Sequence, residues 1–365
     1  MPYYHIWTIG CQMNRADSER IASYLEQIGY EPTSRAVDAE IIVLNSCVVR
    51  QSAENRVVNK LSAVKTLKRG GNPILVLTGC MVDSRVDELR RRFPQVDLFF
   101  GPQAYGELSA FLIERGIAPR GWDPGLLPPR PAPSVFEPII QGCDNFCSYC
   151  IVPSRRGRER SRPMEEVLCE VQGLAARGVK EVTLLGQNVN SYGHDLSQRP
   201  DLADLFEALN QVEGLARIRF LTSHPRDMSP RIIEAMARLE KVCEYLSLPL
   251  QAGDDDILRA MRRGYTAEQY RRLIQSIRYA VPHVALSTDV IVGFPGESEE
   301  QFQRTCDLLG ELRFDTVHVA AYSPRPGTIA ARRLVDDVPM EEKKRRQQRV
   351  EQLQEGIASD INAQL

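Results

Sequence analysis

The stretch FEPIIQGCDNFCSYC, residues 136–150, joins an apolar strand pattern to three cysteines at the spacing C-x3-C-x2-C. Cys143, Cys147 and Cys150 follow the predicted strand directly, at the carboxyl end where a βα barrel places its active site. Thiols this close together in sequence predict a shared metal centre. No histidine or fourth cysteine lies nearby, so the trio predicts either an iron–sulfur cluster with one open iron or a zinc site completed by a distant residue.

Five more strand patterns follow this stretch, and helical patterns such as MEEVLCEVQGLAARG and ESEEQFQRTCDLLGEL lie between most of them. The strand patterns are EVTLLGQ, RIRFLTS, EYLSLPLQ, ALSTDVIVGF and TVHVAAYS. Six βα units are fewer than the eight that close a TIM barrel. We therefore expect a partial, TIM-like (β/α)6 barrel over residues 135–365. Its C-terminal helix carries apolar Val350, Leu353, Ile357 and Ile361 at helical spacing and a charged face that we expect to be solvated.

Residues 1–117 also alternate between strand and helix patterns. YYHIWTIG, AEIIVLN, NPILVLTG and VDLFFG read as strands, and ADSERIASYLEQIGY is the first of the helices between them, with a polar cap. This alternation predicts an α/β fold with a parallel sheet. Six prolines between Pro119 and Pro133 predict a linker over 118–134, between an N-terminal domain (1–117) and the barrel.

Three more cysteines follow the first three of these strands. Cys11 comes after WTIG, Cys47 after LNS and Cys80 after LTG, separated by about one βαβ unit each. Because the carboxyl ends of parallel strands meet at one edge of a sheet, we expect these three thiols to converge and hold a second cluster. Cys169, Cys243 and Cys306 have apolar neighbours and are assigned to packing.

The composition describes an ordinary globular chain of 365 residues with a formal net charge of −2. Local patches, and no global field, must therefore attract any nucleic acid. No apolar run is long enough to span a membrane and no secretory leader is evident. Nine cysteines without a disulfide-scaffold pattern indicate a reducing, cytoplasmic setting.

These motifs resemble those of a known family. CDNFCSYC is the signature of radical S-adenosylmethionine (SAM) enzymes. With GCQMN, LNSCVVR and LTGC before it, and GRERSRP, LLGQNVNSYG, SLPLQAG, STDVIVGFPGE and YSPRPGT after it, the sequence resembles the methylthiotransferase family over nearly its whole length. GQNVNSYG is similar to the tRNA-modifying branch, which acts on N6-isopentenyladenosine beside the anticodon.

The resemblance implies two [4Fe-4S] clusters and S-adenosyl-L-methionine, with SAM as the fourth ligand of the open iron. It implies a 5′-deoxyadenosyl radical that activates C2–H of the adenine, and a second cluster that carries the sulfur. No acid–base residue pair is expected to act, because that carbon is neither acidic nor attached to a leaving group. The implied partners are the tRNA anticodon stem-loop and a low-potential electron donor such as flavodoxin or ferredoxin. A monomer is expected.

The resemblance also implies positions that contact SAM. Tyr149 either lies against the SAM adenine or packs within its loop. Gly186, Gln187 and Asn188 end the second barrel strand, where the superfamily contacts the methionine amino group. Ile291 and Gly293 either approach the adenosine or belong to the barrel core.

A basic stretch follows the cluster turn, and its position beside the active site predicts contacts with RNA phosphate or with the SAM carboxylate. The alternative is a solvated surface loop. Its members are Arg155, Arg156, Arg158, Arg160 and Arg162.

Two features depart from the family pattern. Relatives usually continue into a small β-barrel RNA-binding (TRAM) domain, and this sequence ends at Leu365, before that domain would start. Ser154 and Arg155 stand where relatives more often have tyrosine and threonine. The other functions to separate are a methylthiotransferase for threonylcarbamoyl-adenosine or for a ribosomal-protein aspartate, and a non-catalytic iron–sulfur or zinc protein that binds RNA.

Overall fold

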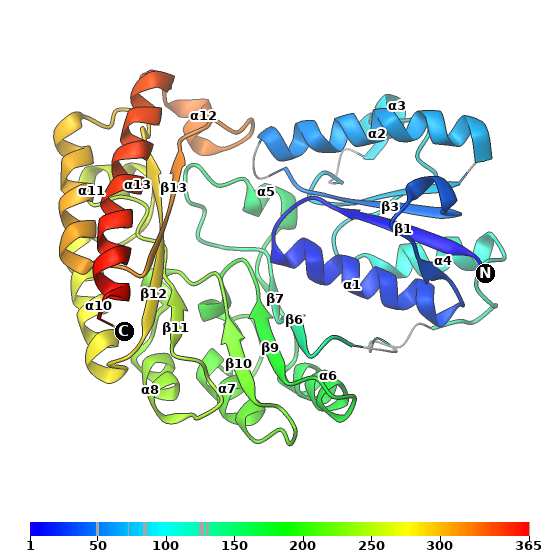
Figure 1. Ribbon diagram of the computed structural model, residues 1–365, viewed down its shortest axis with the longest axis horizontal. Coiled ribbons are helices and arrows are strands. Elements are labelled where there is room, and N and C mark those ends of the chain that lie inside the picture. Colours follow the sequence, from blue (N-terminus) through cyan, green and yellow to red (C-terminus); the bar gives the residue numbers. More distant parts are fainter. Residues whose placement is uncertain (49–50, 72, 83–85, 124–127, 129–130, 365) are drawn as a thin grey trace. The chain divides into compact units, whose positions relative to one another are not determined.

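The computed structural model of the chain describes residues 1–48, 51–71, 73–82, 86–123, 128 and 131–364 (Figure 1). The chain divides into two compact units. The first contains Met1–Pro138 and Cys169–Lys180, and the second contains Ile139–Leu168 and Glu181–Leu365. The first unit thus includes the predicted linker, of which residues 124–127 and 129–130 lie outside the described part. Trp122, within that linker, packs edge-on against Tyr24 in the core of the first unit.

A five-stranded parallel sheet forms the centre of the first unit, in the order β2–β1–β3–β4–β5. Its strands and helices match the predicted alternation, with a short additional strand, β2. The elements are β1 (Tyr3–Thr8), α1 (Gln12–Gln27), β2 (Glu31–Pro32), β3 (Ile41–Ser46), α2 (Gln51–Gly71), β4 (Ile74–Gly79), α3 (Val86–Arg92), β5 (Leu98–Phe99), α4 (Tyr105–Glu114) and β6 (Ser134–Pro138).

Helices cover both faces of this sheet, which explains why β3 is a continuous apolar run buried along its whole length. Ile42 and Leu44 pack with α2 and α3, whereas Ile41 and Val43 pack with α1 and α4. Figure 1 shows α2 and α3 on one side of the sheet and α1 and α4 on the other. Because helices cover both faces of the sheet, only the ends of the strands are left uncovered, and polar residues lie there.

Helix α1 begins at Gln12, four residues before the start of the predicted helical segment at Ala16, so the predicted start was wrong. The polar residues expected to cap it have partners elsewhere: Asp17 Oδ1 accepts a hydrogen bond from the Tyr105 hydroxyl, and Ser18 Oγ accepts one from Thr8. The helix cap is Cys11 instead, whose side chain accepts no hydrogen bond from the backbone N–H groups of the first turn. The cysteine therefore lies at the first turn of a sixteen-residue helix.

The second unit is built from βα repeats with parallel strands. The strand orders within this unit are β9–β10 and β11–β12–β13, and a parallel bridge between Ile218 and Val242 continues the series from β10 toward β11. The elements are β7 (Ile140–Gln141), α5 (Val152–Arg156), β8 (Arg160–Ser161), α6 (Met164–Ala176), β9 (Glu181–Leu185), α7 (Leu202–Asn210), β10 (Arg217–Phe220), α8 (Pro230–Arg238), β11 (Tyr245–Ser247), α9 (Asp255–Ala260), α10 (Ala267–Ala280), β12 (Ala285–Val292), α11 (Glu299–Leu312), β13 (Thr316–Ala321), α12 (Ile329–Arg333) and α13 (Met340–Asn362).

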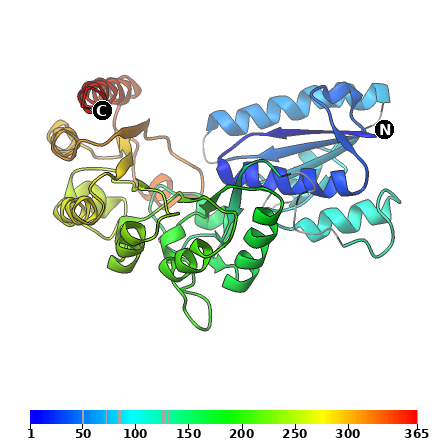
Figure 2. The same cartoon turned by 60° about the horizontal axis from the view of Figure 1, so that its bottom comes forward.

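These strands form the predicted partial barrel, with helices outside them (Figure 2). Two predicted strands are shorter than expected, because proline cannot donate to a strand ladder. Pro138 ends β6, and the two residues of β7 instead pair antiparallel with β8. β11 ends at Ser247, before Pro249, although Gln251 N–H still donates to Asp289 O at 2.8 Å.

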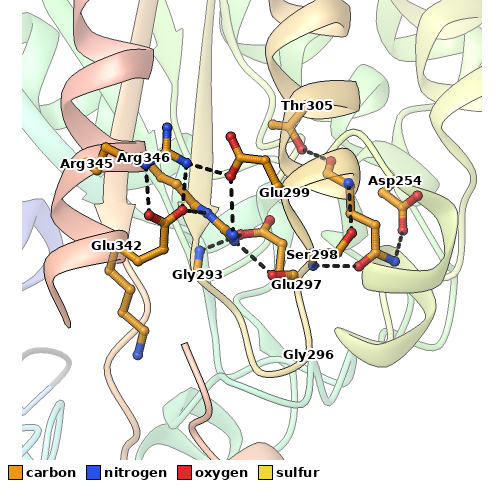
Figure 3. A network of polar contacts seen from close by, with 12 residues as sticks. Asp254, Gly293, Gly296, Glu297, Ser298, Glu299, Thr305, Glu342, Arg345 and Arg346 are labelled. Carbon is orange, nitrogen blue, oxygen red and sulfur yellow. Dashed lines mark hydrogen bonds and ion pairs between the residues drawn. The ribbon is translucent and has the colours of Figure 1, made fainter. Parts of the chain in front are cut away.

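The C-terminal helix α13 packs on the outer side of β13 and against α11. Val350 and Ile357 are buried, as predicted from their spacing. The predicted solvated charged face was wrong for Lys343 and Arg346, which are also buried. Figure 3 shows the reason for Arg346: it faces Glu297, which lies in the loop between β12 and α11. No helix in the described part of the chain is long and apolar enough to cross a membrane.

Candidate active site

The loop that carries Cys143, Cys147 and Cys150 is held at its start by close backbone contacts. Gly142 has φ +79°, and a Cβ there would overlap the Arg158 carbonyl oxygen, so only glycine fits. Its N–H donates to Gln187 Oε1 at 2.6 Å, and Cys143 N–H donates to Gly157 O at 3.2 Å. The cysteine loop is therefore anchored to its own returning segment and to the residues that follow β9.

A second anchor lies in the middle of the loop. Ser148 N–H donates to Met261 O at 3.0 Å and its hydroxyl donates to Ala260 O at 2.7 Å, so the end of α9 binds this serine twice. Ser148 O accepts a hydrogen bond from Ala330 N–H at 2.7 Å, at the start of α12. These bonds fix the loop between its second and third cysteines, Cys147 and Cys150.

The thiols in this loop suit a metal cluster. Cys147 is buried, whereas Cys143 and Cys150 are half-buried. Burial raises the pKa of Cys143 to about 11 and that of Cys150 to about 12. Without a cation these groups stay protonated at neutral pH, and a coordinating metal deprotonates them outright. Cys143 and Cys150 are therefore poor nucleophiles and suitable cluster ligands.

Buried polar atoms without a hydrogen-bond partner follow three successive barrel strands. Among the residues that the structure describes, they include Asn188 Oδ1 and Asn190 Oδ1 after β9, Ser223 Oγ and His224 Nε2 after β10, and Gln251 Oε1 after β11. Such atoms are costly unless something satisfies them. Their common position at the carboxyl ends of the strands fits a polar ligand in the mouth of the barrel.

The proton on His224 is placed by its neighbours. Its Nδ1 accepts a hydrogen bond from Arg226 N–H at 3.2 Å, so the proton of the neutral ring lies on Nε2. Burial, followed by the nearby Arg263 charge, lowers the pKa of His224 to about 3, although Asp227 opposes this. His224 is thus a neutral donor with its Nε2–H group unpaired.

We expect His224→Asn to flatten the pH dependence of stability. The unfolded histidine takes up a proton below its usual pKa of about 6.5, while the folded one stays neutral, so stability falls as pH falls toward 3. The loss between pH 7 and pH 5 is about 2 kcal/mol for one such group. Urea unfolding at both pH values should show a smaller loss in the variant. His283→Asn, at an exposed position, is the control and should retain the wild-type slope.

The structure brings the predicted residues after β9 to the cluster loop. Gln187 holds Gly142, and Asn188 donates to Asp227 Oδ2 at 2.7 Å, which leaves its Oδ1 unpaired. Gly186 is buried, and a Cβ there would overlap Ile140. Gln187 and Gly186 therefore position the loop, and only Asn188 presents an unpaired buried polar atom to a ligand.

Tyr149 and Ile291 are partly buried and pack against an apolar cluster that contains Phe294. Tyr265 packs against the same cluster. Gly293 differs from both, because its missing side chain makes room for Lys343 of α13. Its N–H donates to Glu297 Oε2 at 2.6 Å. The group that approaches Gly293 closely is thus the Lys343 side chain of the protein itself.

The basic stretch divides by exposure. Arg158 and Arg160 are exposed and Arg155 and Arg162 are half-buried, whereas Arg156 is only 7% exposed. Arg158 forms an ion pair with Asp144 at 2.6 Å. The predicted RNA contact therefore suits Arg158 and Arg160, and the buried Arg156 is unsuited to it.

In the first unit, Cys11, Cys47 and Cys80 follow β1, β3 and β4, which are neighbours in the sheet. Cys47 and Cys80 come directly after the paired residues Ser46 and Gly79, and Cys80 N–H donates to Ser46 O at 2.8 Å. A Cβ added to Gly10 would lie 3.0 Å from Cys47 Cβ, so the turn before Cys11 reaches Cys47. The three cysteines thus follow neighbouring strands at the same edge of the sheet.

A buried pair of amides lies beneath these cysteines. Asn14 donates to Asn45 Oδ1 at 2.8 Å and to Ser46 O at 3.0 Å, and its own Oδ1 accepts from Cys11 Sγ at 3.4 Å. Asn45 donates back to Asn14 O at 2.7 Å. The pair ties the start of α1, and with it Cys11, to the end of β3.

Of the cysteines assigned to packing, Cys306 is buried and Cys243 is half-buried, whereas Cys169 is exposed, so the assignment was wrong for Cys169. Within the described ranges, no three Cys, His, Asp or Glu side chains surround a point as ligands of a single metal ion.

Comparison with known proteins places this chain in a family. Residues 138–309 match the radical SAM superfamily, and residues 3–101 match a family described as uncharacterized, UPF0004. The tRNA-2-methylthio-N(6)-dimethylallyladenosine synthase of Dehalococcoides mccartyi (strain CBDB1) is 52% identical over 100% of this chain and 85% of its own length. The chain belongs to this synthase family. The synthase of Roseiflexus sp. (strain RS-1) is 50% identical over 99% of this chain and 77% of its own.

Solved radical SAM structures share the fold of this synthase-family chain. The radical SAM methyltransferase TsrM from Kitasatospora setae superposes with a TM-score of 0.64 at 15% identity, covering 91% of this chain and 77% of its own. OxsB, a cobalamin-dependent radical SAM enzyme, gives 0.60 at 11% identity, covering 97% and 56%. Family membership makes this chain a radical SAM enzyme and implies SAM and an iron–sulfur cluster. The cysteine loop after β7 provides a ligand set that fits that cluster.

Sequence reasoning missed Ser223, His224, Gln251 and Arg263. One signal was available for the first two, because Ser223 ends the predicted strand RIRFLTS and His224 directly follows it, at the carboxyl end where ligands bind. Gln251 has φ +73°, a conformation rare outside glycine, and no sequence pattern predicts it. Arg263 lies more than a hundred residues from the cysteine loop, and only the folded chain brings them together.

Proposed function

We propose that this chain is a tRNA methylthiotransferase that places a methylthio group at C2 of N6-isopentenyladenosine beside the anticodon. The observation that carries the proposal is the ordered pair of cysteine trios, one after three neighbouring parallel strands and one in the loop after β7, in a chain about half identical to named synthases over its full length. A bound cluster with SAM would supply the radical chemistry that a C2–H bond requires.

In this proposal Cys143, Cys147 and Cys150 hold the cluster that binds SAM. Asn188 Oδ1 is a buried acceptor suited to an ammonium group, and His224 Nε2–H is a buried donor suited to a carboxylate. These two side chains support an amino-acid headgroup near the loop. Tyr149 and Ile291 supply apolar surface for an adenine ring.

Cys11, Cys47 and Cys80 hold a second [4Fe-4S] cluster in this proposal. Support comes from their position after three neighbouring strands and from the buried amides that fix Cys11. Exposed Arg158 and Arg160 are suited to contact phosphates of the tRNA anticodon stem-loop. A flavodoxin or ferredoxin would supply electrons, and the protein would act as a monomer in the cytoplasm.

The test is product analysis with the whole chain. Protein purified anaerobically and reconstituted with iron and sulfide should contain about eight irons. With SAM, dithionite and tRNA bearing isopentenyladenosine, mass spectrometry of the digested tRNA should show a methylthio adduct. The adduct on threonylcarbamoyl-adenosine tRNA instead would indicate the other tRNA reaction. Bound zinc and no 5′-deoxyadenosine would favour a non-catalytic binding protein, and product on neither tRNA would favour the ribosomal-protein reaction.

We expect Asn14→Ala to lower the iron content from about eight to about four per chain. Loss of a residue that orients a ligand weakens metal binding by about 10- to 100-fold. The variant should still cleave SAM but should yield little methylthio product. Iron is counted on the folded fraction, because the lost amide also leaves Asn45 without its donor. Gln12→Ala, exposed in the same first turn, is the control. Full iron and normal product in Asn14→Ala would contradict the second cluster site.

A further inference from the structure

Arg263 is a buried cation beside the cysteine loop of the barrel. Only 5% of its surface is exposed, and it follows α9 in the turn that leads to Tyr265. Its guanidinium lies over the Tyr265 ring, 5.3 Å from the centroid. A charge removed from water in this way is stable only where partners replace the lost hydration.

Three hydrogen bonds replace that hydration. Nη1–H donates to Cys147 Sγ at 3.3 Å, Nε–H donates to the Tyr265 hydroxyl oxygen at 2.9 Å, and Nη2–H donates to Pro249 O at 3.2 Å. Within the described residues, no carboxylate forms an ion pair with this arginine, and its hydrogen bonds go to a thiol, a phenol and a carbonyl. The thiol is the one partner that becomes an anion when a cluster binds.

The contact with Cys147 is held from both sides. The Tyr265 hydroxyl, which receives Arg263 Nε–H, lies 2.8 Å from Leu250 O, to which it can donate. On the cysteine side, Ser148 is bound to Ala260 O and Met261 O, just before Arg263 in the chain. The same short segment therefore positions both the guanidinium and the loop residue next to Cys147.

We propose that Arg263 is a positioning residue that donates a hydrogen bond to the Cys147 thiolate and thereby raises the reduction potential of the barrel cluster. This inference rests on the proposed cluster at Cys143, Cys147 and Cys150. One electron from a low-potential donor converts the cluster from its 2+ to its 1+ core, with no bond formed or broken and no proton transferred. The reduced cluster carries more negative charge, so a cation and a hydrogen bond at its sulfur stabilise that form more.

Arginine suits this position better than lysine does. Its fork donates to three acceptors at once, and it stays protonated in the buried site. A lysine could keep the charge but could not reproduce the same three hydrogen bonds in a plane. The two contributions, charge and hydrogen bonding, can therefore be separated by substitution.

The experiment is an EPR-monitored redox titration with dithionite and low-potential mediators. The parent is the full chain with Cys11→Ala, Cys47→Ala and Cys80→Ala, so that one cluster gives the signal. Arg263→Gln should shift the reduction equilibrium about tenfold toward the oxidised form, a potential about 59 mV more negative for one electron. Arg263→Lys should shift it less. Arg259→Gln, a largely exposed arginine on the adjoining helix, should leave it unchanged.

Iron content is measured on every sample. If Arg263→Gln fails to fold or to hold iron, Arg263→Lys and Tyr265→Phe decide the matter, and each should still lower the potential. The inference is overturned if Arg263→Gln shifts the reduction equilibrium less than threefold from that of the parent. It is also overturned if the potential is unchanged while SAM binding is weaker, a result that would assign Arg263 to binding the cofactor. A parent without iron refutes the proposed cluster itself, whereas an iron-loaded, SAM-cleaving parent with an unshifted variant refutes only the role of Arg263.

Discussion

Replacing Cys143 by alanine should reduce 5′-deoxyadenosine formation to the level seen without protein. The remaining two thiols, Cys147 and Cys150, cannot hold a cluster that leaves a single iron open. No cluster is then present to donate an electron to SAM, and no side chain of the barrel can replace it as the electron donor. The measurement is chromatographic detection of 5′-deoxyadenosine after incubation with SAM and dithionite, alongside iron analysis, which should fall from about eight to about four per chain.

The matched control is Cys169→Ala. Cys169 is exposed on α6, away from either trio in the sequence, so its loss should change neither iron content nor SAM cleavage. Circular dichroism should show that Cys143→Ala retains its fold, because the loop is still anchored by Gly142 and Ser148. SAM cleavage by folded Cys143→Ala at the wild-type rate would remove the barrel trio from the reaction.

The sequence was sufficient to predict where the six proposed ligand cysteines lie. Each of Cys11, Cys47 and Cys80 follows an apolar strand, and the parallel sheet that such strands form brings their ends together whatever the helices contribute. The loop of Cys143 needs even less, because its ligands are neighbours in sequence. Positions of this kind can be predicted from the sequence, since they depend on strand direction and local spacing alone.

The surroundings of those cysteines depend on tertiary packing, and the sequence did not predict them. Arg263 and Cys147 are far apart in the chain. From the sequence MRRGYT alone, an arginine at this position is predicted to be an exposed residue at a helix end. The same applies to α1, whose expected cap residues Asp17 and Ser18 form hydrogen bonds with other elements. Competing partners from distant segments decided these positions, and local propensity could not foresee them.

Helix α13 shows the same effect with a measurable consequence for stability. Arg346→Met should lower the free energy of unfolding by about 3–5 kcal/mol, the usual cost of breaking a buried ion pair from one side. Arg346 Nη1 lies 2.8 Å from Glu297 Oε2, and the two side chains are 5% and 1% exposed. The substitution leaves Glu297 with the Gly293 N–H as its partner in the loop after β12 (Figure 3). Urea unfolding at neutral pH provides the measurement.

Arg345→Met is the control, one residue earlier on the same helix. Arg345 pairs with Glu299 and Glu342, but its side chain is 52% exposed, so its loss should cost at most about 1 kcal/mol. Equal losses in the two variants would show that burial is not what makes the Arg346 pair important.

Adding Glu297→Gln to Arg346→Met should recover part of the stability, because the stranded charge is then removed while the glutamine oxygen can still accept from Gly293 N–H. Burial already raises the pKa of Glu297, and losing Arg346 raises it further. A carboxyl whose pKa is higher in the folded state than in the unfolded state destabilises the fold as pH rises through that interval. The single variant should therefore weaken further from pH 5 to pH 8 relative to the double variant, and parallel pH profiles would mean that Glu297 is not a buried charge.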